Sequence, residues 1–193
     1  MPAMIELDKK YVVKVAVKMV NDKGWDAVNA RSLAKELGVS TKPLYRIYKS
    51  MDEIKEDIYT EIYHQYDEFI TSRIDSKKAL LTLAISYVEF ASQYKNLFIS
   101  LFLSHNLKWK SINDVLDEKW NQSTIINLVN KHGKSFEEAK NLFMTFWLYT
   151  NGFATLLATN DIVMDEKEIL VRLVKMYKVI MGGDSLQSDE KSV

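Results

Sequence analysis

The stretch LAKELGVSTKPLYRIYKSMDEI, residues 33–54, constrains the fold more than any other part of the sequence, because it stops and restarts a helix twice. Gly38 is a natural helix stop, and a short second helix follows it. SMDE at 50–53 then has the pattern of a capping box that opens a further helix. A helix, a tight turn with glycine and a short crossing helix form the helix-turn-helix arrangement, so the stretch predicts this motif.

Proline restricts where the short helix begins. If Ser40 is the N-cap, Pro43 falls at the third helical position and cannot donate the amide that the cap would accept. Thr41 is therefore the better cap, unless Ser40 accepts from the amide of Lys42 instead. In either register Pro43 lies in the first turn, where backbone amides have no intrahelical partner to lose. The short helix then extends to about Tyr48.

The rest of the chain has helical periodicity throughout, and we predict an all-α fold. Only two prolines and six glycines occur in 193 residues, which leaves little room for sheet turns. Asp8 and Asn29 are suitable N-caps for the first two helices, and SFEE (135–138) and DEKE (165–168) repeat the capping-box pattern. The expected helices run over residues 8–23, 29–37, 41–48, 50–74, 76–94, 97–104, 111–131, 135–159 and 165–181.

The net charge is zero, but the charges are unevenly distributed. Residues 1–50 carry ten Lys and Arg against five Asp and Glu, and the other 143 residues carry sixteen against twenty-one. A basic N-terminal quarter on an acidic body suits contact with a polyanion through one end only. The chain has no cysteine, which excludes disulfides and thiolate sites and fits a cytoplasmic location.

Membrane and enzymatic roles find no support in the sequence. The N-terminal segment has no apolar stretch typical of a signal peptide, and polar residues interrupt the uncharged run 141–160, so we expect a buried helix there. His64, His105 and His132 lie on separate segments with no carboxylate at metal-ligand spacing. Because no phosphate-binding glycine loop or nucleophile motif occurs, we expect no catalytic residues, no metal and no cofactor.

Helical spacing divides the motif into an inner and an outer face. The inner positions are apolar or aromatic: Leu37, Val39, Leu44 and Tyr48. The outer positions supply cations, hydroxyl groups and an aromatic ring: Thr41, Lys42, Tyr45, Arg46 and Lys49. Side chains of these types on a short rigid helix are what the reading of base edges in the DNA major groove requires.

The stretch VVKVAVKMVNDKGWDAVNARSLAKELGVSTKPLYRIYKSMDEI, residues 12–54, resembles the N-terminal DNA-binding domain of the TetR (tetracycline-repressor-like) transcriptional regulators. The shared features are an apolar stripe that ends in a charged turn and Gly24, LAKELGVS at 33–40, LY at 44–45, and the aromatic Tyr48 before an acidic helix start. The spacing GVSxxxLYxxY is specific, whereas a helix-turn-helix pattern alone is not.

The resemblance implies roles for residues of the motif. Three would approach base edges: Thr41, Lys42 and Tyr45. Five would hold phosphates: Asn29, Arg31, Ser40, Arg46 and Lys49. Many members of the family have Lys where this chain has Met51, so one phosphate contact is lost here unless Lys49 substitutes for it.

The resemblance also implies a homodimer, in which the last two helices form a bundle with those of the partner, and a ligand cavity among the preceding helices. The region 141–158 is apolar on nearly every side, as expected if one side faces a partner and another a cavity. Gly152 in mid-helix indicates close helix packing. The predicted pocket residues are aromatic, with one amide: Tyr87, Phe90, Phe98, Phe102, Trp120, Phe143, Trp147 and Asn151.

We therefore predict a helix-turn-helix DNA-binding domain at 1–50, a helical effector-binding and dimerisation domain at 51–181, and a disordered tail at 182–193. The leading hypothesis is a homodimeric repressor that leaves a near-palindromic operator in double-stranded DNA when a small, largely apolar ligand binds. A second hypothesis is a DNA-binding regulator controlled by a partner protein. A third is a helical enzyme or lipid carrier whose N-terminal motif is vestigial.

Overall fold

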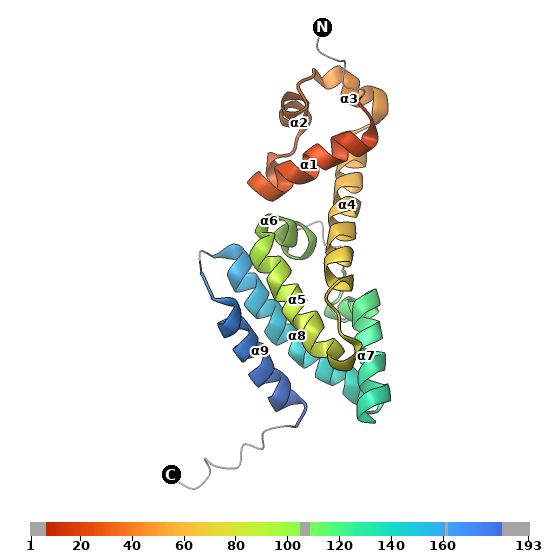
Figure 1. Cartoon of the computed structure of the whole chain (residues 1–193). Coiled ribbons are helices and arrows are strands. Elements are labelled where there is room, and N and C mark those ends of the chain that lie inside the picture. The colour runs from red at the N-terminus through yellow and green to blue at the C-terminus, as the bar shows by residue number, and fades with distance from the viewer. Residues whose placement is uncertain (1–6, 105–108, 161, 183–193) are drawn as a thin grey trace. The chain divides into compact units, whose positions relative to one another are not determined.

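Every regular element that the computed structural model describes is a helix, which confirms the predicted fold class (Figure 1). The structure describes residues 7–104, 109–160 and 162–182. His105 and all but the first residue of the predicted tail lie outside these ranges. The chain divides into two compact units, formed by residues 1–69 with 93–107 and by residues 70–92 with 108–193.

The first unit consists of short helices arranged around the N-terminal part of one long helix (Figure 1). Its elements are α1 (Lys9–Lys23), the 3₁₀ turn η1 (Trp25–Ala27), α2 (Ala30–Glu36), α3 (Thr41–Ile47), most of α4 (Met51–Thr71), α6 (Lys95–Phe98) and the π-helical turn η3 (Ile99–Leu103). Asp8 caps α1 by accepting from the backbone N–H of Tyr11 at 2.7 Å, as its sequence predicts.

The core of the first unit forms where α4 packs on the helices around it. Ile54, Ile58 and Ile62 recur every four residues along α4, and all three are fully buried. Full burial of one such side chain contributes roughly 1.5–3 kcal/mol. α6 packs against α1, where the side-chain amide of Asn96 donates to the carbonyl of Asn21 at 2.8 Å.

The second unit is built on α8, which packs against α7 on one side and α9 on another (Figure 1). Its elements are the 3₁₀ turn η2 (Ser76–Lys78), α5 (Ala79–Gln93), the 3₁₀ helix η4 (Ile112–Asp117), α7 (Lys119–His132), α8 (Phe136–Thr159) and α9 (Glu166–Ile180). The capping box predicted for α8 is confirmed, because the Ser135 hydroxyl accepts from the N–H of Glu138 and the Glu138 carboxylate accepts from Ser135. The same contact lowers the pKa of the Glu138 carboxyl.

The single helix predicted over 111–131 is wrong, because the chain forms η4 and α7 there instead. A capping box between Ser111 and Asp114 starts η4. Glu118 then takes an extended conformation, with φ −63° and ψ 137°, and its carboxylate accepts from the indole N–H of Trp109 at 3.0 Å. The side-chain amide of Asn121 donates to the carbonyl of Val115, so side chains take over backbone groups that a continuous helix would have paired.

Other element ends also differ from the prediction. The helix expected at 97–104 begins at Lys95 and widens into the π turn η3, where the hydroxyl of Ser100 bonds back to the carbonyl of Asn96 at 2.6 Å. α4 ends at Thr71, before the predicted 74. The capping box predicted at 165–168 is not closed, because Glu168 pairs with Arg172 at 2.7 Å on the same helix.

Candidate nucleic-acid interface

The turn between α2 and α3 is closed by local hydrogen bonds. The side-chain oxygen of Asn29 accepts from the N–H of Ser32 at 3.1 Å, which completes a cap at the start of α2. Gly38, at φ +69°, ends the helix, and the N–H of Val39 donates to the carbonyl of Ala34 at 2.9 Å. This pattern is a Schellman motif, which glycine favours because its backbone reaches positive φ without a Cβ clash.

The start of α3 corrects the expected cap. Ser40 is the N-cap and Thr41 is the first helical residue, so the prediction of Thr41 as cap is wrong. The Ser40 side chain makes no capping hydrogen bond, including none to the amide of Lys42. Pro43 accounts for part of this, because it stands at the third helical position and has no N–H to donate. The exposed Ser40 hydroxyl therefore carries no capping role.

The predicted division of the motif into two faces is confirmed by burial. Leu37, Leu44 and Tyr48 are buried, and Val39 is half-buried. On the other side, Tyr45 is 49% exposed. The outer face also holds half-buried Thr41 and three exposed cations, Lys42, Arg46 and Lys49.

The cations of this face are not neutralised by neighbouring acids. Within the described residues, neither Lys42, Arg46 nor Lys49 forms an ion pair, and neither does the exposed Arg31 on α2. Asn29 is also exposed, although its side-chain oxygen is already used in the cap of α2. Unpaired cations on one surface create a positive potential that attracts phosphates.

Glu53 joins the start of α1 to the turn between α3 and α4, in a contact that sequence analysis missed. Its Oε1 lies 2.7 Å from Nζ of Lys9, and its Oε2 accepts from the backbone N–H of Lys49 at 2.8 Å. The Ser50 hydroxyl accepts from the N–H of Glu53 at 3.2 Å, so half of the predicted SMDE capping box forms. The carboxylate reaches Lys49 instead of Ser50. We call these contacts of Glu53 with Lys9 and Lys49 the Glu53 bridge.

The Glu53 bridge lies beside the buried ring of Tyr48. Nζ of Lys9 is 4.5 Å from the centroid of that ring, and the Tyr48 hydroxyl donates to the Lys9 carbonyl at 3.5 Å. The hydrogen bond with Lys9 lowers the pKa of the Glu53 carboxyl, helped by the Lys49 amide, and the same contact raises the pKa of Lys9. Burial raises the pKa of the Tyr48 hydroxyl, so this ring stays neutral.

Met51, at the position where the family resemblance leads us to expect Lys, is the first residue of α4 and is half-buried. An apolar side chain there cannot pair with a phosphate. Lys49 stands two residues earlier and is exposed, and the Glu53 bridge holds its backbone amide. Lys49 is therefore the cation nearest in sequence that is available on this turn.

Two of the predicted ligand residues in the second unit, buried Tyr87 and half-buried Asn151, form a polar pair. The Tyr87 hydroxyl of α5 donates to Oδ1 of Asn151 on α8 at 2.9 Å. Tyr87 is 6% exposed, and its burial raises the pKa of the hydroxyl. The nearby Thr150 is also buried, but its hydroxyl bonds back to the carbonyl of Phe146 at 2.7 Å.

The other predicted ligand residues are divided between the two units. Phe98 and Phe102 belong to the first, where their ring centroids lie 5.2 Å apart, and the remaining four belong to the second, as Tyr87 and Asn151 do. Phe90 and Phe143 are core residues, each 1% exposed. Trp147 is half-buried and meets the ring of Trp109, a residue that sequence analysis did not select, at 5.9 Å between centroids. Trp120 is half-buried, with Nζ of Lys119 4.7 Å from its ring centroid.

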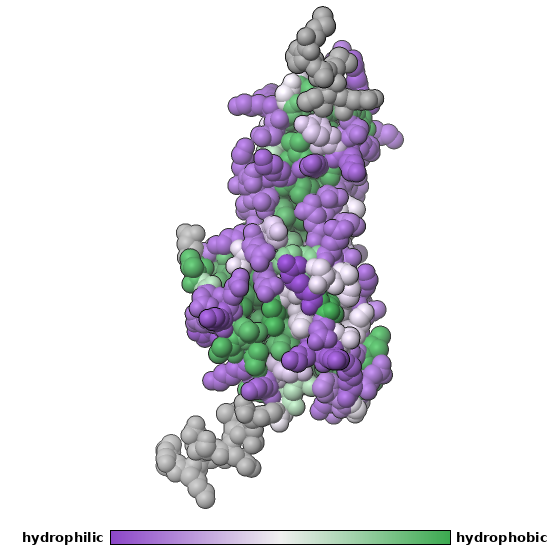
Figure 2. All heavy atoms as spheres, viewed as in Figure 1, coloured by the Kyte–Doolittle hydropathy of each residue, from purple (hydrophilic) through white to green (hydrophobic). Residues whose placement is uncertain are grey.

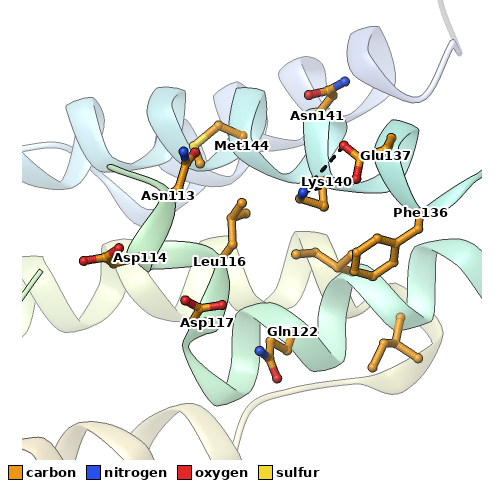
Figure 3. Close-up of a pocket in the computed structure, with 12 residues that line it drawn as sticks. Asn113, Asp114, Leu116, Asp117, Gln122, Phe136, Glu137, Lys140, Asn141 and Met144 are labelled. Atoms are coloured by element: carbon orange, nitrogen blue, oxygen red, sulfur yellow. Dashed lines mark hydrogen bonds and ion pairs between the residues drawn. The ribbon is translucent and has the colours of Figure 1, made fainter. Parts of the chain in front are cut away.

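A groove of about 680 Å³ lies between η4, α7 and α8 of the second unit (Figure 3), and none of the predicted ligand residues lines it. Apolar side chains contribute to its wall, and two of them, Ile126 and Phe136, are more than half exposed. Glu137 and Lys140 form an ion pair at 3.2 Å on its α8 side. The residues that line this η4–α7–α8 groove are Asn113, Asp114, Leu116, Asp117, Gln122, Ile125, Ile126, Phe136, Glu137, Lys140, Asn141 and Met144.

Large apolar side chains are also exposed on α8 and α9, and Figure 2 shows hydrophobic surface beside α9. They recur at helical spacing, so they form stripes along both helices. These residues are Leu148, Tyr149, Leu156, Leu170, Val171 and Val179, which we call the α8–α9 face. Gly152 lies on the same side of α8, and a Cβ placed there would meet no described atom within 4 Å apart from the neighbouring backbone of its own helix. The close packing predicted at Gly152 is therefore absent within the described part of one chain.

The described residues lack the features of two other classes of protein. They contain no group of three His, Asp or Glu side chains that could bind a metal ion. None of their helices has the length and apolar character needed to cross a bilayer. His64 lies on the exposed side of α4, 3.7 Å from the carboxylate of Glu68, and His132 ends α7 directly before Gly133.

The α2–α3 geometry and the unpaired cations on α3 define a helix-turn-helix DNA-binding protein. Residues 12–58 match the model of the bacterial regulatory proteins of the tetR family. The chain is 23% identical over 167 residues to the HTH-type transcriptional regulator Rv0681 of Mycobacterium tuberculosis, and the alignment covers 83% of this chain and 74% of that protein. Its fold is similar to that of the ketosteroid transcriptional regulator KstR2 of Mycobacterium tuberculosis, with TM-score 0.50, 10% identity, and coverage of 93% and 96% of the two chains.

Residues 12–58 therefore match the DNA-binding domain of the tetR family of bacterial regulatory proteins, as the resemblance of residues 12–54 predicts. The chain is a DNA-binding transcriptional regulator, and its relatives form a non-enzymatic class. The hypothesis of a helical enzyme with a vestigial motif is therefore set aside.

Proposed function

We propose that this regulator is a cytoplasmic homodimer that represses transcription from a near-palindromic operator and is released by a small, largely apolar ligand. The main support for the DNA side is the outer face of α3, where exposed Lys42 and Arg46 have no carboxylate partner in the described part of the chain. Paired cations would gain little from phosphates, because each would first have to give up its partner.

The proposed DNA contacts are of two kinds, those with base edges and those with phosphates. Thr41, Lys42 and Tyr45 project from the first turns of α3 and meet base edges in the major groove. The other contacts hold the phosphates on either side and fix the register of the helix on the duplex. These phosphate-binding residues are Asn29, Arg31, Ser40, Arg46 and Lys49.

The α8–α9 face supports the dimer. Monomeric proteins rarely expose such a run of large apolar side chains on two adjacent helices, because each costs free energy in water. The open position at Gly152 suits close approach by a helix of a second copy. Two-fold pairing of this face would present two α3 helices to two half-sites, which requires a near-palindromic operator.

The Tyr87–Asn151 pair supports ligand control through the interior of the second unit. It is a polar contact among apolar side chains, the combination by which ligand pockets orient largely apolar molecules. We propose a ligand site near this pair, whose aromatic residues include Phe90, Phe143 and Trp147. A ligand that prefers a conformation with wrongly spaced α3 helices then withdraws the dimer from DNA.

The η4–α7–α8 groove favours the second hypothesis, control by a partner protein. Ile126 and Phe136 are 53% and 56% exposed there, and acidic side chains at its edge outnumber the single Lys140. A partner with an apolar side chain and basic neighbours would match such a surface.

Binding to DNA selected from a random-sequence library tests the proposal. We expect enrichment of an inverted repeat, one dimer per duplex by analytical ultracentrifugation, and at least about a thousandfold preference over random duplex. Enrichment of a single half-site by a monomer would contradict the dimer.

Ligand control has its own test. Ligand affinity is measured through tryptophan fluorescence with and without the selected operator. Operator must weaken binding of a releasing ligand by the factor by which that ligand weakens operator binding. Equal ligand affinities in the two conditions would favour the partner-protein hypothesis.

A further inference from the structure

We infer that Glu53, an acidic residue, is a positioning residue for DNA binding, because it holds the backbone that carries Lys49. The inference rests on the proposed phosphate contact of Lys49. Glu53 itself touches no DNA in this arrangement. Its two carboxylate oxygens are used separately, with Oε1 on Nζ of Lys9 and Oε2 on the N–H of Lys49.

The geometry ties three separate segments together at one carboxylate. Lys9 begins α1, Lys49 lies in the turn after α3, and Glu53 is in the first turn of α4. The ammonium of Lys9 also lies over the ring of Tyr48, which is 1% exposed and so cannot move without disturbing the core. The peptide N–H of Lys49 is therefore fixed from the α1 and α4 sides together, and its side chain leaves the surface from a defined point.

The charges of the Glu53 bridge explain why Lys49 and not Lys9 is the cation left for DNA. Lys9 faces two carboxylates, Glu53 at 2.7 Å and Asp57 at 3.8 Å. Lys49 gives its backbone N–H to Glu53, and its ammonium attracts the same carboxylate from a distance but forms no ion pair within the described residues. Because Met51 supplies no cation at the start of α4, the proposed phosphate contact on this turn depends on the position of Lys49.

Charge alone predicts the opposite effect of losing Glu53. Removal of a carboxylate beside a DNA-binding surface lowers the repulsion of phosphates, so a purely electrostatic role predicts tighter binding for every duplex. A positioning role predicts weaker binding to the operator. Asp52 is the matched control, since it is an exposed acid one residue away in the same helical turn, with no hydrogen bond or ion pair in the described structure.

The test compares Glu53→Ala, Glu53→Gln and Asp52→Ala by fluorescence anisotropy on the selected operator and on a random duplex. We expect Glu53→Ala to weaken operator binding about tenfold and to lower the slope of log affinity against log salt by about one, because one phosphate contact is lost. Glu53→Gln should keep most of the operator affinity, since its side-chain oxygen still accepts from Lys49. Asp52→Ala should bind both duplexes as tightly as the parent chain or more tightly.

A double-mutant comparison separates positioning from a general loss of structure. In a chain that already carries Lys49→Ala, the further change Glu53→Ala should leave the salt slope unchanged, because the contact it serves is gone. Circular dichroism checks that each variant is folded. If Glu53→Ala does not fold, Glu53→Gln is compared with Asp52→Ala in its place. Equal behaviour of Glu53→Ala and Asp52→Ala on the operator would overturn the inference. Absence of any selected operator for the parent chain would overturn the proposed function instead.

Discussion

The two units of this regulator differ in where their polar side chains of interest lie: on the surface in the first unit and toward the interior in the second. In the first, Lys42, Tyr45 and Arg46 are exposed on a helix whose other side is buried, and the cations lack partners in the described chain. In the second, the Tyr87 hydroxyl and the Asn151 amide are turned inward and bonded to each other. A surface that reads DNA has to leave its donors unpaired, whereas an interior that holds an occasional ligand has to satisfy its polar groups meanwhile.

The largest effect on operator binding is expected from a substitution in the α8–α9 face. This face is a part of the second unit where large apolar side chains are exposed. Leu156 is 51% exposed, so Leu156→Glu should leave the melting temperature nearly unchanged. Charge repulsion across the two-fold axis should dissociate the dimer and weaken operator binding by roughly a hundredfold or more, because one half-site alone loses the second contact. Sedimentation and anisotropy measure both effects.

Ile126→Glu is the control for the dimer prediction. Ile126 is similarly exposed, at 53%, but it lines the η4–α7–α8 groove. This variant should stay dimeric and bind the operator normally. A dimeric Leu156→Glu, or a monomeric Ile126→Glu, would place the interface elsewhere.

A paired substitution tests the contrast between buried and exposed aromatic residues. Phe143→Ala should lower the free energy of unfolding by about 3–5 kcal/mol, since Phe143 is 1% exposed in the core of the second unit. Tyr45→Ala should change it by less than about 0.5 kcal/mol and yet weaken operator binding, since Tyr45 is half exposed on α3. Urea unfolding followed by circular dichroism gives the stabilities. A large loss of stability in Tyr45→Ala would mean that its ring serves packing.

Substitution of two cations of α3 should have different effects, one on sequence preference and the other on affinity for every duplex. Lys42→Ala should relax the preference at one base position by roughly 1–3 kcal/mol, whereas Arg46→Ala should weaken all duplexes alike and lower the salt slope by about one. Binding to a panel of single-base operator variants at several salt concentrations distinguishes them. Equal losses with unchanged sequence preference in both variants would contradict the proposed roles.

The smallest effect is expected at a half-buried carboxyl of the second unit. Burial raises the pKa of Glu89, although Arg73, 3.6 Å away, opposes the change. The ionised form then costs stability at neutral pH, and the cost disappears once the pH falls below the ordinary value of 4.5. Glu89→Gln should therefore raise the melting temperature by about 1–2 °C at neutral pH and by nothing in acid. Calorimetry that found a lower melting temperature at neutral pH would show that the Arg73 pair dominates.

Local signals predicted the first unit well and the second less well. Gly38, Leu44 and Tyr45 lie within eight consecutive residues, so local spacing alone placed the helix stop and the two faces of α3 correctly. Thr41 was preferred to Ser40 as the cap of α3 because the choice assumed a side-chain capping bond, which Ser40 does not form. The break between η4 and α7 was missed because side chains such as Asn121 pair backbone groups that periodicity assigns to a helix.

Local sequence patterns do not predict contacts between residues that are far apart in the sequence. Capping chemistry drew attention to Glu53, but its partner Lys9 stands 44 residues earlier, and no local pattern joins them. The same limit applies to the ligand residues. Aromatic residues at helical spacing look alike whether they fill a core, as Phe143 does, or line a pocket, and only the folded arrangement separates Phe98 from Trp147 into different units.

The two faces of α3 also have a consequence for how regulators of this kind diverge. The turn before α3 is closed by backbone groups and Gly38, and the helix is anchored through Leu44 and Tyr48. The outward positions 42, 45 and 46 belong to none of these contacts. Substitutions there change which DNA is read at almost no cost to folding, so after gene duplication one copy can acquire a new operator while it keeps the same scaffold.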